Sequence, residues 1–299
     1  MQRTLVQQGS TTLMVSLPAK WVQENKLKKG STIDINRINQ NLMISSFGNN
    51  YQLKIIIKLK GLTESLIRTY ITNTYRKGFD NIKVFYETKE QLSILKEVIK
   101  TRLIGFEITK TEKSYCIVES VTEPSLDLFE NIFSKLIFNI SQLLDLCLEN
   151  SSFKRDTYEE IEENIQRYDN FCRRVISKGA RLTGEKELYW TFLTLIVHGN
   201  REIYFLIKET KKTKYSPALL LLIKKVKEIF DLIKKSYLER RVDHFEELHF
   251  LEKEVRIEAK KIIFKGKEEA VFASLLLSAS RRFYQANSPL LGLILQGED

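Results

Sequence analysis

The sequence predicts a multidomain α+β protein in three parts: a small β domain at residues 1–47, a small α/β middle domain at 51–122 and a six-helix bundle at 125–290. Three observations lead to this fold class. A chain of 299 residues is longer than one compact core usually organises. Only 4 prolines and 12 glycines interrupt it, which favours long helices joined by short connections. Strand-like alternation of apolar residues precedes Pro124, and helical spacing follows it.

The first domain is expected to contain the strand pair 4–17 with a turn at 7–10, the helix 18–25, and the strands 32–36 and 41–46. Leu13, Val15 and Leu17 alternate as on one face of a strand. Pro18 suits the first turn of a helix, and Ile33 and Ile35 are expected to face inward. So small a unit buries too little surface to be stable alone, so we expect it to pair with a second copy by intertwining of hairpins.

A family resemblance lies in this first domain. The residues that carry it are Arg3, Gly9-Ser10, Val15-Ser16-Leu17-Pro18, Lys20-Trp21-Val22, Leu27, Lys29-Gly30 and Ile33. Their order resembles the AbrB/SpoVT swapped-hairpin DNA-binding domain, although Ser10 and Thr11 stand where that family often has a second glycine. The resemblance implies a homodimer or higher even oligomer that presents basic side chains to double-stranded DNA. The basic positions available for this are Arg3, Lys20, Lys26, Lys28 and Lys29.

The net charge of the chain is consistent with a polyanionic partner. The formal charge is +10, and residues 1–50 carry six basic side chains against two acidic ones. Such a field attracts nucleic acid or an anionic membrane surface, although it also serves simply to keep a protein soluble or to decorate a dimerisation module. We prefer DNA because the charge and the expected fold of the first domain agree.

The middle domain follows a Gly/Asn-rich linker at 47–50. Its expected elements are the strand 51–60, the helix 62–77, the strand 82–86, the helix 88–103, and the strands 106–111 and 115–121. Thr88 is expected to cap the second helix. This small α/β layer either hosts a ligand or spaces two other domains. No glycine-rich phosphate loop occurs in the sequence, so no motif supports nucleotide binding.

The C-terminal part is expected to be an antiparallel bundle made of two loosely repeated sets of three helices. The predicted helices are 126–149, 157–182, 185–211, 216–241, 243–265 and 268–287, with breaks at 150–152, 183–184, 215–217 and 266. Six such helices after an α/β spacer resemble the PhoU-type phosphate-uptake regulators, in the arrangement where an AbrB-like domain precedes the bundle. The resemblance implies control of phosphate-transport genes.

Candidate metal ligands in the bundle follow from the same resemblance. Glu162 and Arg174 fall on the family's glutamate and arginine, but Gln166 stands where its metal-binding aspartate is typical. Asp243 and Glu247 have a four-residue spacing that places two carboxylates on one helical face, where a divalent or trivalent cation could bridge them. The alternative for this pair is a solvated acidic face beside lysines.

No catalytic constellation is evident, so we expect a protein that is not an enzyme. His244 and His249 are five residues apart and outside any zinc-hydrolase motif, and His198 is expected to lie in the bundle interior. The three cysteines form no CxxC pair and are expected to be buried thiols of a reducing compartment. The N-terminus lacks a signal-peptide core and the apolar runs are too short to span a bilayer, so we expect a cytoplasmic protein without membrane insertion.

Two functions remain open on the sequence. The first is a DNA-binding transcription regulator of phosphate uptake and homeostasis that senses through its PhoU-like bundle. The alternative is a cytosolic adaptor that binds a phosphate ABC transporter ATPase or a signalling kinase, with the N-terminal module used only for oligomerisation.

Overall fold

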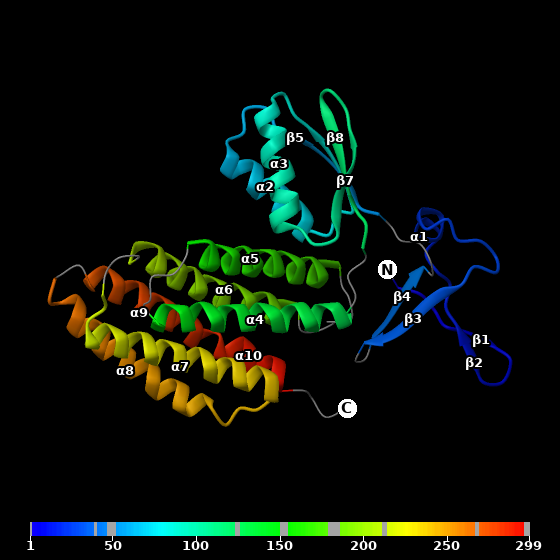
Figure 1. Ribbon diagram of the computed structural model, residues 1–299. Helices are drawn as coiled ribbons and strands as arrows, with labels where there is room; N and C mark the ends of the chain where they lie inside the picture. The colour runs from blue at the N-terminus through cyan, green and yellow to red at the C-terminus, as the bar shows by residue number, and fades with distance from the viewer. Residues whose placement is uncertain are drawn as a thin grey trace. The chain divides into compact units, whose positions relative to one another are not determined.

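The protein is mixed α+β with a large helical C-terminal region (Figure 1). The computed structural model describes residues 2–38, 41–46, 52–122, 126–149, 155–178, 186–210, 214–266 and 269–295. The chain divides into two compact units, Met1–Gln52 and Leu53–Asp299, called here the N-terminal and C-terminal units. The three expected parts thus correspond to two units, the second of which contains two hydrophobic cores. The expected linker at 47–50 lies outside the described residues.

The N-terminal unit is built from two separate antiparallel hairpins and one short helix. Its elements are β1 (Val6–Gln8), β2 (Thr12–Met14), α1 (Ala19–Glu24), β3 (Ile33–Ile38) and β4 (Asn41–Ser46). β1 pairs with β2 and β3 pairs with β4, and each pair forms its own two-stranded sheet. Gln7 and Gln8, expected in the first turn, lie instead in β1, because the turn begins two residues later, at Gly9 with φ +75°. The order of strands and helix agrees with the sequence expectation.

The C-terminal unit begins with a small α/β layer. Its elements are β5 (Lys54–Lys58), α2 (Glu64–Arg76), β6 (Asn81–Phe85), α3 (Lys89–Arg102), β7 (Phe106–Thr111) and β8 (Tyr115–Ser120). The strands lie in the order β5-β6-β8-β7, with β5 parallel to β6 and the other neighbours antiparallel. All six expected elements are present, and the Thr88 hydroxyl accepts a hydrogen bond from the Gln91 N–H at 3.2 Å as the expected cap.

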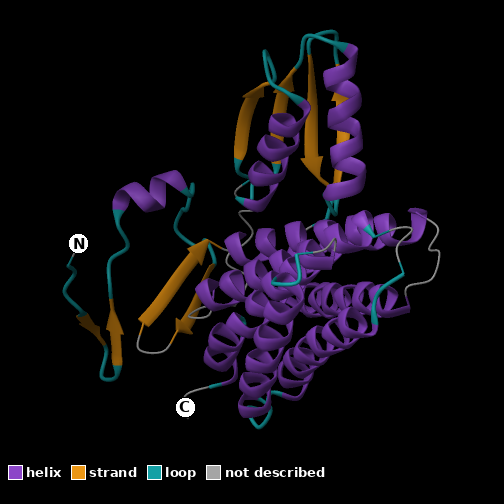
Figure 2. Ribbon diagram, turned by 90° about the vertical axis from the view of Figure 1, so that its left-hand side faces the viewer, coloured by secondary structure: helices purple, strands orange, loops and turns teal. Residues whose placement is uncertain are grey.

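The two helices of this layer cover one face of the sheet (Figures 1 and 2). Alternation along the strands gives that face the buried residues Ile57, Ile82, Val84, Cys116 and Val118. The layer therefore has a hydrophobic core of its own. α2 and α3 also contact α5 of the bundle, so the layer and the bundle form one compact unit.

The bundle contains seven helices within the described ranges. They are α4 (Leu126–Glu149), α5 (Arg155–Lys178), α6 (Lys186–Glu209), α7 (Pro217–Glu239), α8 (Phe245–Ile263), α9 (Glu269–Gln285) and α10 (Asn287–Ile294). Their apolar faces share one core. The closest neighbours include α4 with α5, α6 with α9, and α8 with α9, so the two expected sets of three helices meet in a common interior.

The bundle differs from the six expected helices mainly in α10 and in the start of α8. α10 follows the last expected helix, 268–287, and was not expected; Pro289 fits as its third residue, because a proline in the first turn needs no N–H partner. α8 begins at Phe245, two residues later than expected, so Asp243 lies in the preceding turn. The expected breaks at 150–152 and 183–184 lie outside the described residues.

The three cysteines are buried and free, as expected for structural thiols. Burial raises the pKa of the Cys116 thiol to about 11, so this thiol is a poor nucleophile at neutral pH. Within the described ranges, every helix is too short or too polar to cross a lipid bilayer.

Candidate nucleic-acid interface

The basic residues of the N-terminal unit are held on short turns and on α1. The peptide N–H of Lys28 donates to the Ser31 hydroxyl at 2.8 Å, and the Ser31 N–H donates back to the Lys28 carbonyl at 2.9 Å. Gly30, with φ +87°, supplies the positive φ that this tight turn needs. The turn fixes the backbone of Lys28 and Lys29 and leaves both side chains exposed.

Lys26 stands at the end of α1 in the left-handed conformation, with φ +51°. Its N–H and that of Leu27 donate to the Gln23 and Val22 carbonyls at 3.0 Å, which satisfies the last carbonyls of the helix. The Asn25 side chain donates to the Trp21 carbonyl at 2.9 Å and its Oδ1 accepts from Ser46 at 3.1 Å, so α1 is tied to β4. The helix end therefore positions Lys26 beside the Lys28–Lys29 turn.

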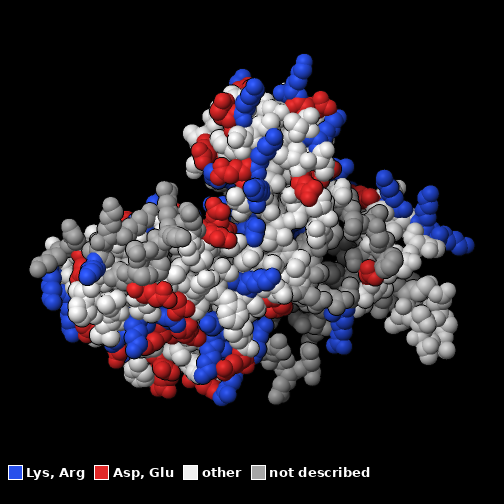
Figure 3. All heavy atoms as spheres, viewed as in Figure 1, with Lys and Arg blue, Asp and Glu red and all other residues white. Residues whose placement is uncertain are grey.

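All five candidate DNA-binding residues are exposed in the single chain. Figure 3 shows basic side chains protruding from this unit. Lys20 lies 4.0 Å from Glu24, but both side chains are so exposed that the pair contributes little. Arg3, Lys26, Lys28 and Lys29 have no ion-pair partner among the described residues. These four cations are available to phosphate groups.

Apolar side chains of the same unit are also exposed. No described side chain of the unit is buried, and the most exposed large ones are Leu5, Val6, Leu13, Met14, Val15, Ile35 and Leu42. Ile33 is half-buried, but Ile35, expected to face inward, is 57% exposed, because neither hairpin covers the other's apolar face. Among its described residues, the unit therefore lacks a hydrophobic core.

Glu162, a candidate metal ligand, is buried and already hydrogen-bonded. The Gln166 amide donates to one carboxylate oxygen at 2.8 Å, and the Asn200 amide donates to the other at 2.8 Å. Burial raises the pKa of Glu162 above its ordinary value, against the lowering effect of these hydrogen bonds. The described groups that contact this carboxylate are therefore amide donors and not the further acidic side chains that would bind a metal with it.

Asp243 and Glu247 do not form the helical pair that their spacing predicts. Asp243 lies before α8 and pairs with Arg241, whereas Glu247 is in the first turn of the helix and is exposed. The two line a broad pocket with Glu246 and Glu254 at the surface of the bundle. No group of three or more His, Cys, Asp or Glu side chains suited to a metal ion occurs in the described part of the chain.

Arg174, identified with a family arginine, joins the bundle to the α/β layer. Its side chain is only 1% exposed, and its guanidinium donates to the Tyr75 and Phe79 carbonyls at 3.1 and 2.8 Å. It also pairs with the equally buried Asp80, which accepts from Lys178 at 2.6 Å. Arg174 thus acts as a structural link between two cores.

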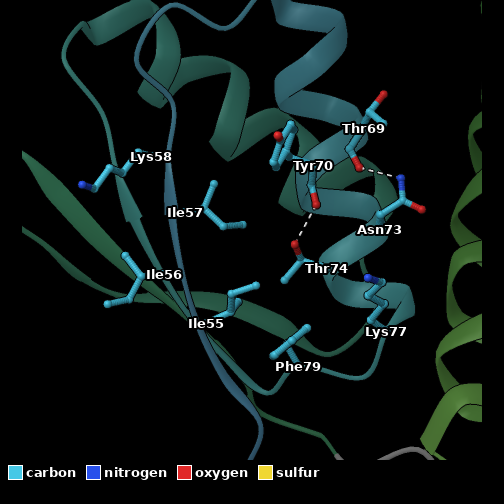
Figure 4. Close-up of a pocket in the computed structure, with 10 residues that line it drawn as sticks. All are labelled: Ile55, Ile56, Ile57, Lys58, Thr69, Tyr70, Asn73, Thr74, Lys77 and Phe79. Carbon is cyan, nitrogen blue, oxygen red and sulfur yellow. Dashed lines mark hydrogen bonds between the residues drawn. The ribbon is translucent and has the colours of Figure 1, made fainter.

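A pocket of about 420 Å³ lies between β5 and α2 (Figure 4). Ile55 and Ile57 point toward the helix, whereas Ile56 and Lys58 point to the other side of the strand. The Thr74 hydroxyl donates to the Tyr70 carbonyl at 2.7 Å, so it is occupied within the helix. The pocket is mainly an apolar gap at the edge of the sheet, and its charged lining residues are Lys58 and Lys77.

The histidines do not form a catalytic site within the described ranges. His198 is exposed rather than in the bundle interior, because it lies on the side of α6 that faces away from the core. Partial burial and the guanidinium groups of Arg282, Arg201 and Arg173 lower its pKa. His249 bonds to the Tyr284 hydroxyl at 2.9 Å. His244 lies beside Glu239, with 3.9 Å between its Nε2 and the carboxylate.

Comparison with known proteins finds no matching family model, no significantly similar curated protein and no significantly similar solved structure. The case for a nucleic-acid interface therefore depends on the residues of the N-terminal unit themselves.

Proposed function

We propose that this protein is a DNA-binding transcription regulator that acts as a dimer or higher even oligomer. The observation that carries the proposal is the N-terminal unit, which combines exposed lysines on defined turns with hairpins that have no core among their described residues. The resemblance to the AbrB/SpoVT domain supports DNA as the ligand. The resemblance of the helical part to PhoU supports phosphate uptake as the regulated process.

The exposed apolar side chains of the N-terminal unit favour pairing with a second copy of the chain. Fully burying one Leu, Ile, Val or Met side chain contributes roughly 1.5–3 kcal/mol. Seven such large side chains are exposed in each chain, and a two-fold pairing of hairpins would bury both sets at once. Because these side chains are 44–69% exposed in the single chain, burying both sets gains roughly 10–25 kcal/mol. That gain is comparable with or larger than the roughly 4–15 kcal/mol that association costs in lost motional freedom. A swapped-hairpin dimer is the arrangement that uses all four strands.

Charge argues that the ligand of this dimer is DNA. The unit has two acidic side chains, and one of them, Glu24, is the partner of Lys20. A dimer doubles the free cations and places them on rigid turns, which suits neutralisation of phosphates along a duplex. Contacts to phosphates position a protein without selecting a sequence, so the operator depends on contacts or DNA shape beyond these lysines.

The test is duplex binding measured by fluorescence anisotropy over a salt series, with a DNA fragment from upstream of the protein's own gene. The variant Lys28→Ala with Lys29→Ala should weaken binding broadly and flatten the salt dependence, by about 0.9 in log–log slope for each phosphate that is no longer neutralised. The matched control, Lys224→Ala with Lys235→Ala, removes the same charge from exposed positions of α7 and should change neither quantity.

An unchanged affinity and slope in the Lys28/Lys29 variant would refute the role of that turn. If the wild-type protein binds no duplex, the adaptor function with an oligomerising N-terminal module replaces the regulator. The phosphate part is tested separately by chromatin immunoprecipitation at high and low phosphate. We expect occupancy to change with phosphate, and constant occupancy would contradict the sensing role.

A further inference from the structure

A polar pocket of about 320 Å³ lies within the C-terminal unit, where the α/β layer meets the bundle. Its walls come from α2, α3, α5 and α6. Five arginines line it: Arg68, Arg76, Arg102, Arg173 and Arg201. The pocket is thus lined by five positively charged side chains from four helices, two in the α/β layer and two in the bundle.

Among the described residues, only one carboxylate lines this pocket, and it is already shared. Asp169 is buried and accepts from Arg76 Nη2 at 2.9 Å and from Arg173 Nε at 2.8 Å. Arg76 is further held by Asn170 Oδ1 at 2.7 Å, and Arg173 by the Thr194 hydroxyl at 3.1 Å. Two of the guanidinium groups are therefore fixed in place around a single negative charge.

The remaining arginines differ in their partners. Arg68 pairs with Glu64 and Glu97, at 2.8 and 2.9 Å. Arg102 and Arg201 make no side-chain hydrogen bond or salt bridge within the described ranges. The pocket therefore holds guanidinium groups whose N–H donors are not used by the described part of the protein.

Neighbouring carboxylates offset this concentration of positive charge only in part. Burial is the main cause that lowers the pKa of Arg76, and Arg173, Arg201 and Arg102 lower it further against the raising effect of Asp169. Burial also lowers the pKa of Arg102, with Arg68 and Arg201 adding to the effect and Glu162 and Glu163 opposing it. A bound anion would satisfy the free donors and reduce the repulsion among these groups.

We infer that this pocket binds inorganic phosphate or a short inorganic polyphosphate. A guanidinium group is a planar fork that matches two oxygens of a phosphate, and forks from several helices require an anion with oxygens in several directions. A phosphate meets that requirement, whereas a carboxylate presents two oxygens in one plane. The volume lies at the lower end for small-molecule sites, which suits a small ligand.

The lining also argues against a nucleotide. Among the described residues, Val197 is the one apolar side chain that lines the pocket, and the nearby Trp190 ring is covered by the Arg173 guanidinium, 4.6 Å from its centre. A nucleobase would find only Val197 and the exposed His198 ring to pack against, so this described lining is much better suited to a phosphate group than to a base.

Phosphate bound here would join the two halves of the C-terminal unit. Arg76 and Arg102 belong to the α/β layer, whereas Arg173 and Arg201 belong to the bundle. A ligand that contacts both sides stabilises the arrangement in which they meet. This inference deepens the sensing role proposed above, but it is tested without DNA, so either proposal can fail alone.

The test is isothermal titration of the full chain with sodium phosphate, sodium pyrophosphate and adenosine monophosphate at constant ionic strength, with sodium acetate as a reference. We expect one saturable site per chain for phosphate or pyrophosphate. The variant Arg102→Gln with Arg201→Gln should weaken binding at least about tenfold, because charge-assisted hydrogen bonds are lost. Arg201→Lys keeps the charge but loses the fork, so it should bind between the wild type and that variant.

The matched control is Arg256→Gln with Arg281→Gln, which removes two arginines from a separate pocket near His249 and should leave the affinity unchanged. Thermal unfolding without ligand checks that each variant is folded; the Arg102 and Arg201 side chains make no hydrogen bond or salt bridge among the described residues, although both interact electrostatically with Glu162. Absence of saturable phosphate binding, or equal affinity in the Arg102/Arg201 variant, would overturn the inference. Tighter binding of adenosine monophosphate than of pyrophosphate would overturn the assignment to inorganic phosphate.

Discussion

The two units of this protein differ in whether their apolar side chains form a hydrophobic core. In the C-terminal unit, two apolar cores are closed and even a buried arginine has its partners, as Arg174 has in Asp80. In the N-terminal unit, the described apolar side chains stay at least partly exposed, and two hairpins share no core. The C-terminal unit has hydrophobic cores of its own, whereas the N-terminal unit has the composition of a fold that needs a second molecule.

The largest expected effect on the stability of the C-terminal unit is at its buried ion network. Arg174→Ala leaves Asp80 buried and short of a partner and removes the donors to two carbonyls, so we expect a loss of about 3–5 kcal/mol in the free energy of unfolding. Chemical denaturation measures it. Arg241→Ala breaks the exposed pair with Asp243 and should cost under about 1 kcal/mol. Equal effects of the two variants would contradict the network's structural role.

A smaller effect is expected where α6 meets α9. A Cβ at position 199 would lie 2.5 Å from the buried Phe283 ring, so Gly199→Ala should destabilise the unit by about 1–3 kcal/mol through overpacking. At Gly292 the nearest atom is the flexible end of Leu188, at 2.8 Å. Gly292→Ala should therefore be better tolerated. Thermal unfolding of both variants measures the difference, and a more stable Gly199→Ala protein would show that the two helices are not in close contact.

The smallest effect concerns pH. The pKa of Glu162 is raised in the folded protein, so its contribution to stability is present below its unfolded pKa and is lost as pH rises through the folded value. Each unit of separation between the two pKa values corresponds to about 1.4 kcal/mol. Relative to the wild type, Glu162→Gln should therefore gain unfolding free energy as the pH rises above about 4.5, the ordinary pKa of a glutamate. Denaturation at several pH values checks this, and a constant difference would contradict the raised pKa.

Much of the fold was predictable because its signals are local. All six elements of the α/β layer were predicted from local patterns, and Thr88 caps α3 as expected. The Ser216 cap of α7 was not predicted, and α10 was missed beyond the last expected helix, 268–287. Ile35 was expected to be covered, but whether a strand face is covered depends on what lies opposite it, which local alternation does not contain.

The candidate sites were predictable to different degrees. The exposure of Lys28 and Lys29 follows from the Gly30 turn that lies beside them in the sequence. The arginine pocket gave no sequence signal, because its residues are spread from Arg68 to Arg201 and meet only when four helices assemble. Asp243 and Glu247 were predicted to form a pair because they are four residues apart. That prediction requires both residues to be helical, but α8 begins only at Phe245, after Asp243.

The central claim is that the N-terminal unit is completed by a second copy of the chain. Sedimentation equilibrium of the full chain and of the Leu13→Glu, Ile35→Glu variant tests it most directly, because pairing would bury both unpaired carboxylates at a cost of several kcal/mol per ion. The account predicts at least twice the 35.1 kDa chain mass for the wild type and a monomer for the variant. A monomeric wild type, or a variant that keeps the wild-type mass, would contradict it.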